Sequence, residues 1–172
     1  MTSRRSPLIV GLLAAAALGL SAAAGAPARA DDEWRSFKGS WSASGRRDTM
    51  PIENDGVASL VHLSGAVVLT ANGGLTSGFR GEVIGFDDGS RGTGRAVWTD
   101  ARGDRIFSAI AGEPLGAGRR VTATITGGTG RYRGIAGDYS LTWQYVVDAD
   151  DAAVQGRSAD LTGRFRLAEG AR

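Results

Sequence analysis

The 172-residue sequence contains no cysteine and only one histidine, His62. Without cysteine the chain has no disulfide, no thiolate nucleophile and no cysteine-ligated metal. A single histidine would need several carboxylate partners to bind zinc, and no G-x-S-x-G motif accompanies it, so neither a histidine metal site nor a Ser-His-Asp triad is favoured. His62 lies in the apolar stretch LVHLSGAVVL, where we expect a packed core or interface residue. The sequence predicts no metal and no cofactor.

Runs of basic residues are absent as well. The whole chain has 20 Lys and Arg against 18 Asp and Glu, but Arg4, Arg5 and Arg29 fall within the first 30 residues, so the rest carries 17 basic against 18 acidic residues, a net charge of −1. No four basic residues follow one another. We therefore expect no clustered basic face and no nucleic-acid partner.

The first 30 residues have the pattern of a signal peptide. A basic start precedes an apolar run from Leu8 to about Leu20, and small residues end at Ala28-Arg29-Ala30. This order predicts cleavage after Ala30 and an exported protein, periplasmic or secreted. The apolar run is shorter than the roughly 20 residues of a membrane span, so no span is expected after cleavage. General and twin-arginine export both stay open. We treat residues 31–172 as one domain.

Signals for helices are nearly absent after this leader. Turn sequences such as ENDG, ANGG and DDGS separate segments rich in β-branched residues, as in chains of β-hairpins. Asp87, Asp88, Asp100 and Asp104 lie in such turns without the spacing of an EF-hand, so turn chemistry is favoured over calcium binding. The predicted strands are residues 35–44, 57–71, 78–88, 93–100, 104–112, 119–127, 134–148 and 157–168.

Several of these strands alternate between apolar and polar residues. In 134–148, Tyr139, Leu141 and Trp143 share one parity, and in 157–168 Ala159 and Leu161 do. One apolar face on eight hairpin-connected strands predicts an all-β fold, an eight-stranded antiparallel up-and-down β-barrel, with a β-sandwich as the alternative. Strand 57–71 is apolar on both parities, which favours burial of its outer face too, against a partner subunit.

The segment TGGTGRYRG at residues 126–134 is rich in glycine and arginine, as phosphate-binding loops often are. It lacks the Lys-Ser/Thr pair of a P-loop, its glycines miss the G-x-G-x-x-G spacing, and a strand follows it where these motifs require a helix. It is better interpreted as the turn between two strands.

The longer stretch ITGGTGRYRGIAGDYSL, residues 125–141, closely resembles a motif of the allene oxide cyclase and dirigent barrels. The segment GRAVWTDARGDRIFS at 94–108 is similar to uncharacterised exported bacterial members. The resemblance implies a β-barrel with a largely hydrophobic cavity, often trimeric, in which this motif is structural. No catalytic residue carries over, because the family's active strands cannot be aligned here. The matching turn residues are Gly127, Gly128, Gly130, Arg131, Tyr132 and Gly137.

A barrel would bring aromatic residues from several strands together in its interior. They either fill it as core or line a pocket for a flat apolar ligand. Glu82 is a further candidate, because a carboxylate inside the barrel would have a raised pKa; the competing interpretation pairs it with Arg80 on the wet face. Three functions stay open: binding of a small hydrophobic or aromatic molecule, a cyclase or isomerase, and a ligand-free structural oligomer. The candidate pocket residues are Trp41, Glu82, Trp98, Tyr139, Trp143, Tyr145 and Phe165.

Overall fold

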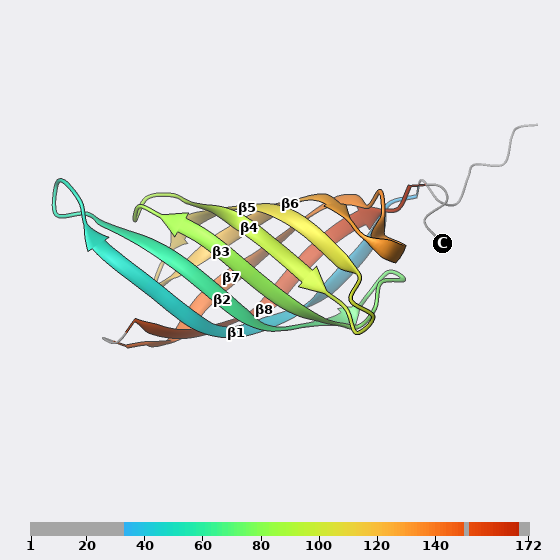
Figure 1. Ribbon diagram of the computed structural model, residues 1–172, viewed down its shortest axis with the longest axis horizontal. Helices are drawn as coiled ribbons and strands as arrows, with labels where there is room; N and C mark the ends of the chain where they lie inside the picture. The colour runs from blue at the N-terminus through green and yellow to red at the C-terminus, as the bar shows by residue number, and fades with distance from the viewer. Residues whose placement is uncertain (1–32, 150–151, 169–172) are drawn as a thin grey trace, which may run out of the picture.

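The computed structural model describes residues 33–149 and 152–168, and the predicted signal peptide lies outside them. Eight strands pair in chain order, and the last pairs with the first, so the sheet closes into a barrel (Figure 1). The predicted eight-stranded antiparallel barrel is confirmed, and the sandwich alternative is wrong. The strands are β1 (Arg35–Pro51), β2 (Val57–Ala71), β3 (Gly78–Asp87), β4 (Gly92–Thr99), β5 (Arg105–Leu115), β6 (Gly118–Gly128), β7 (Ala136–Asp148) and β8 (Ala153–Arg166).

The turns fall at two opposite ends of the barrel, because each strand is antiparallel to the next. We call the end that holds the β1–β2, β3–β4, β5–β6 and β7–β8 turns the mouth; it lies on the left in Figure 1. The β2–β3, β4–β5 and β6–β7 turns lie at the other end, with a single turn of 3-10 helix, η2 (Gly130–Tyr132), between β6 and β7. No helix in the described part of the chain is long and apolar enough to cross a membrane.

The core is the barrel interior, and it is filled by the alternate residues of each strand that point inward. In β6, Ala123 and Ile125 are buried while Thr122 and Thr124 are exposed, as the alternation predicts. Aromatic rings from different strands meet there: the Phe37 and Trp98 centroids are 5.9 Å apart, and Trp98 and Tyr139 are 4.8 Å apart. Such pairs stabilise a core beyond the apolar area that they bury.

Two strands depart from the predicted pattern. β1 extends to Pro51, seven residues beyond the predicted end at 44, because the polar segment after Ser44 still pairs fully with β2. In β8 the predicted inward residue Ala159 is exposed and Ser158 is buried. The reason is a register shift against β1, where Gly39 pairs with Leu161 but Trp41 pairs with Ser158. This irregularity reverses the parity of the strand, which alternation alone does not reveal.

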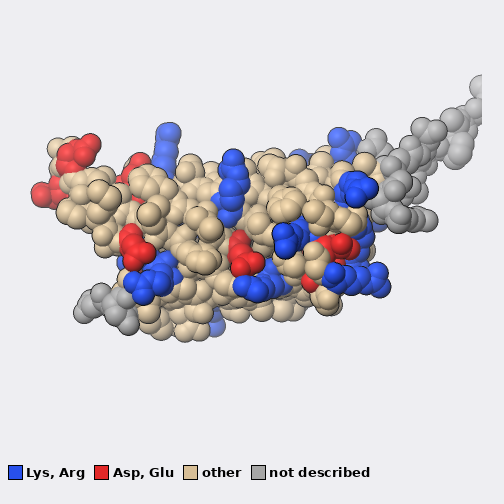
Figure 2. All heavy atoms as spheres, in the orientation of Figure 1, with Lys and Arg blue, Asp and Glu red and all other residues tan. Residues whose placement is uncertain are grey.

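The outer face of β2 is exposed in this single chain. Leu60 is 61% and Val68 is 49% accessible, and His62 beside them is also exposed. Within the chain the outer face of β2 is therefore not buried and His62 is not packed in the core, whereas burial of this face against a partner subunit stays a prediction. On the face shown in Figure 2, basic and acidic side chains are interspersed, and wide uncharged areas lie between them.

Candidate functional site

The predicted pocket residues divide between cavity, core and outer surface. An internal cavity of about 100 Å³ lies between the middle of the barrel and the mouth, and Trp41, Trp98, Tyr139, Trp143 and Tyr145 all line it. Its other apolar lining residues include Val61, Leu63, Val83, Ala96, Ile110, Val121 and Leu141.

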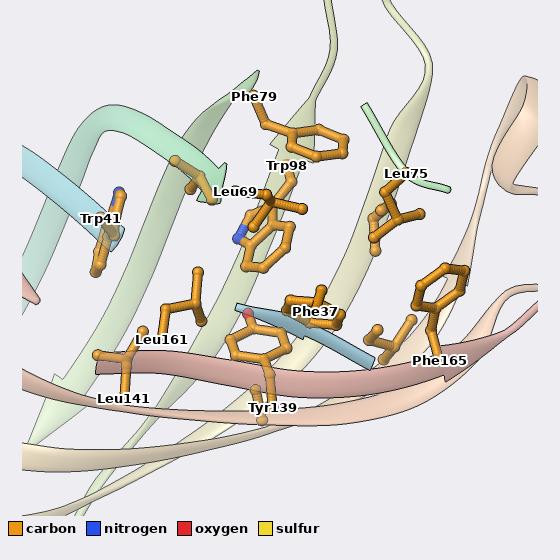
Figure 3. Packing of buried hydrophobic residues seen from close by; sticks show 14 of the residues in the cluster. Phe37, Trp41, Leu69, Leu75, Phe79, Trp98, Tyr139, Leu141, Leu161 and Phe165 are labelled. Atoms are coloured by element: carbon orange, nitrogen blue, oxygen red, sulfur yellow. The ribbon is translucent and has the colours of Figure 1, made fainter. Parts of the chain in front are cut away.

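Phe165 and Glu82 do not line this cavity. Phe165 is fully buried, and the centre of its ring lies 6.2 Å from that of Phe37, so it belongs to the filled part of the core (Figure 3). Glu82 lies on the outer face of β3, where its carboxylate accepts a hydrogen bond from Arg80 at 2.8 Å. The assignment of Glu82 to a pocket is therefore wrong. The competing interpretation, a pair with Arg80, is observed, and both residues of the pair lie in β3.

The size of the cavity restricts what it can hold. Pockets for drug-sized ligands measure about 300–1,000 Å³, whereas this cavity measures about 100 Å³. Apolar cavities of about 150 Å³ in other proteins stay dry and bind benzene. The cavity therefore matches a single ring at most, unless side chains move.

An ion pair stands where the cavity meets the mouth. Arg119 of β6 reaches Asp87 of β3 at 2.6 Å and donates a second hydrogen bond to the carbonyl oxygen of Gly89 at 3.2 Å. Strands β4 and β5 lie between these two strands in the barrel, so the pair spans part of the opening. The exposed fractions of the two side chains are only 21% and 17%, and both residues line the cavity.

A second ion pair lies on the opposite side of the mouth. Arg47 of β1 contacts both carboxylate oxygens of Asp148 at 2.6 Å, and its guanidinium lies 5.2 Å from the centre of the Tyr145 ring. A depression of about 350 Å³, which we call the vestibule, is lined by both pairs and by Val61 and Tyr145. Because Val61, Tyr145, Asp87 and Arg119 also line the cavity, the vestibule adjoins it.

The glycine-rich loop occupies the opposite end of the barrel. Its η2 turn places the ring of Tyr132 in the interior, 2% exposed and 5.8 Å from the ring of Phe79. Gly130 has φ of +52°, which favours glycine, and a Cβ there would lie 1.8 Å from Oδ1 of Asp104, so any other residue would have to displace the Asp104 side chain. The loop therefore closes this end, in agreement with its interpretation as a turn.

A buried carboxylate ties this loop to the β4–β5 turn. The side chain of Asp100 is fully inaccessible. It accepts hydrogen bonds from the backbone N–H groups of Arg102 at 2.7 Å and Asp104 at 3.1 Å, from Nε of Arg131 at 2.8 Å and from the Tyr132 hydroxyl at 3.0 Å. Nη2 of Arg131 donates to the same carboxylate. The sequence predicted Asp100 only as a turn residue. Its ion-pair partner, Arg131, was noted in the glycine-rich loop, but no local pattern linked the two residues.

These contacts shift the ionisation of the whole cluster. Burial acts to raise the pKa of Asp100, but the hydrogen bonds from Arg131, Arg102 and Tyr132 outweigh it and lower that pKa. Burial, together with the hydrogen bond to Asp100, raises the pKa of Tyr132 to about 12. The cluster therefore holds a charged carboxylate and a neutral phenol at ordinary pH, which suits a structural anchor.

Inside the cavity the ionisable groups are few. Burial raises the pKa of Tyr139 to about 12, and a hydrogen bond with Ser108 opposes the shift. No group of three or more His, Asp or Glu side chains that would hold a metal occurs in residues 33–149 and 152–168. Asp88 instead caps its own turn, accepting hydrogen bonds from the backbone of Ser90 and Arg91.

No family model and no curated protein matches this sequence. Among solved structures, the chain is similar to two pterocarpan synthase dirigent proteins. One shares 11% identity with a TM-score of 0.46, over 78% of this chain and 87% of that one. The other shares 12% identity with a TM-score of 0.42, over 80% of this chain and 98% of that one. These values are too low to show a common family or activity, so membership in the allene oxide cyclase and dirigent family stays a prediction.

Proposed function

We propose that the barrel binds one small apolar or aromatic molecule in the cavity below the mouth. The observation that carries this proposal is a largely apolar cavity walled by Trp41, Trp98, Trp143, Tyr139 and Tyr145 and adjoining a vestibule. Aromatic walls of this kind offer large apolar contact with few polar groups to fix orientation, as in small-molecule sites generally.

A cyclase or isomerase is less well supported. A cyclase or isomerase that only steers a reactive intermediate by the shape of its cavity needs few acid–base groups, but one that transfers protons uses an acid or base with a pKa near the working pH. Tyr139, the buried ionisable group that faces the cavity, has a pKa raised to about 12 and stays protonated. Asp87 at the cavity's edge is engaged by Arg119 and by the N–H of Gly89 at 2.7 Å. The lining therefore favours binding over proton transfer.

Toluene tests the proposal, because it is an uncharged single ring. At ten times its dissociation constant a ligand that binds only the folded state stabilises it by about 1.4 kcal/mol. We expect toluene to raise the thermal midpoint of the full chain and to change its tryptophan fluorescence. In the cavity-filling variant Ala96→Leu both effects are expected to disappear, because Ala96 lines the cavity and is 3% exposed.

The control is Ala109→Leu, on the outer side of the neighbouring strand β5, which adds the same volume outside the cavity. It is expected to respond to toluene as the parent does. If toluene changes neither the midpoint nor the fluorescence of the parent, the barrel is a filled structural core and the binding proposal is wrong.

A further inference from the structure

The unpaired polar atoms in the cavity wall are hydrogen-bond donors. Throughout the described residues, the buried side-chain nitrogen and oxygen atoms without a hydrogen-bond partner are Nε1 of Trp41 and Nε1 of Trp143. Both residues line the cavity and are 7% and 3% exposed. An indole N–H only donates, and leaving it buried without an acceptor costs free energy.

Trp41 lies against bare backbone. A Cβ on Gly81 would lie 3.0 Å from Nε1 of Trp41, and Gly81 is itself a lining residue. The missing side chain at Gly81 thus lets the indole edge approach the backbone, where the Cβ of any other residue would be too close to it. The Trp143 ring lies 4.6 Å from that of Trp41, so the two unpaired donors belong to one aromatic pair.

The arginine of the ion pair at the mouth also has an unused hydrogen-bond donor. A guanidinium has five N–H groups in a planar fork, and Arg119 uses Nη2 for Asp87 and Nη1 for the carbonyl oxygen of Gly89. Among the described residues, Nε of Arg119 has no acceptor. Oδ1 of Asp87, by contrast, accepts from both Arg119 and the N–H of Gly89. Arg119 therefore has capacity for a second acceptor without release of Asp87.

From the free Nε donor of Arg119 beside an apolar cavity we infer that the ligand is a small aromatic carboxylate, with its ring in the cavity and its carboxylate at the mouth against Arg119. This inference rests on the proposed binding function and adds the ligand's chemical class and orientation. The cavity supplies space for one ring, and a carboxylate supplies acceptors that form strong charge-assisted hydrogen bonds with guanidinium groups. An aromatic cation is the competing ligand, because Oδ2 of Asp87 accepts no hydrogen bond among the described residues, but the positive charge of Arg119 beside it would repel a cation.

Three probes of matched ring size test the inference at pH 7: benzoate, toluene and benzylamine. Isothermal titration calorimetry on the full chain is expected to rank benzoate tightest. The variant Arg119→Gln should weaken benzoate by about tenfold or more, the loss expected when a charged hydrogen bond is removed. Its loss of toluene affinity should be several-fold smaller than its loss of benzoate affinity, because toluene has no charged group to pair with Arg119. Retained toluene binding also shows that the variant is folded.

The matched control is Arg164→Gln, which removes an arginine from an ion pair with Asp138 on the outer surface, where the side chains are 59% and 52% exposed. It should leave all three affinities unchanged. If toluene binds and Ala96→Leu abolishes that binding, but benzoate is indifferent to Arg119→Gln or benzylamine binds tightest, the carboxylate inference is wrong while the binding function stands. If none of the probes binds, the binding function itself fails.

Discussion

Replacing Asp100 with asparagine should destabilise the barrel at its closed end. In the parent, one carboxylate serves two backbone N–H groups of the β4–β5 turn and the Arg131 and Tyr132 side chains of the β6–β7 loop. Asparagine keeps one acceptor oxygen and places an N–H₂ group where the other stood. With the oxygen on the backbone side, the amide faces the guanidinium donors of Arg131 and those bonds are lost.

The magnitude follows from the burial of these groups. Hydrogen bonds to a charged group contribute about 1.5–3 kcal/mol each, but Arg131 is 36% exposed and can turn partly toward water. We therefore expect Asp100→Asn to lower the free energy of unfolding by about 2 to 3 kcal/mol, and the thermal midpoint by roughly 10 °C. Urea unfolding followed by tryptophan fluorescence measures this loss.

The pH dependence gives an independent check on the same residue. Because the pKa of Asp100 is lower in the folded protein than its ordinary value of 3.8, its stabilising effect is fully present above that value and is lost as the pH falls below it. The difference between parent and variant should therefore shrink below about pH 4. Asp138→Asn, at an exposed pair, should cost less than about 1 kcal/mol. If Asp100→Asn lowers the free energy of unfolding by no more than Asp138→Asn does, Asp100 is not a structural anchor.

Three further changes probe other parts of the barrel. Gly130→Ala should lower the free energy of unfolding by about 2 kcal/mol or more, because its Cβ would collide with Asp104. Gly116→Ala, with φ of +58° and open space around it, should lower it by about 1 kcal/mol, and thermal unfolding measures the difference between the two variants. The raised pKa of Tyr139, about 12, makes folding less favourable as the pH rises above about 10, so Tyr139→Phe should show a shallower loss of stability between pH 8 and 11 in urea unfolding. Glu82→Gln should change the free energy of unfolding by less than about 0.5 kcal/mol, and a larger loss would mean that its pair with Arg80 is structural.

The local pattern predicted the strands better than it predicted the site. Alternation and turn residues are properties of neighbouring positions, so the eight strands and the inward direction of Trp143 were accessible from the sequence. Whether an inward residue fills the core or lines the cavity depends on how the rings pack across the barrel. Alternation places both Phe165 and Tyr145 on the inward side, so it could not show that Phe165 fills the core while Tyr145 lines the cavity. The Arg119–Asp87 pair joins two strands that are separated by two others in the barrel, and no local pattern encodes such a contact. The register shift between Ser158 and Leu161 could not be predicted for the same reason, because it is defined by the pairing with β1.

The closure of the barrel has a consequence for how the chain folds. Arg35 in the first strand pairs with Phe165 in the last, so the ring cannot be completed until nearly the whole chain has been made. Before that moment β1 and β7 are edge strands with unpaired N–H and C=O groups, which are sites for pairing with other chains. Contacts between such distant segments also slow folding. A truncation that removes β8 should therefore aggregate, even though every remaining hairpin is intact, because the loss of one strand reopens two edges at once.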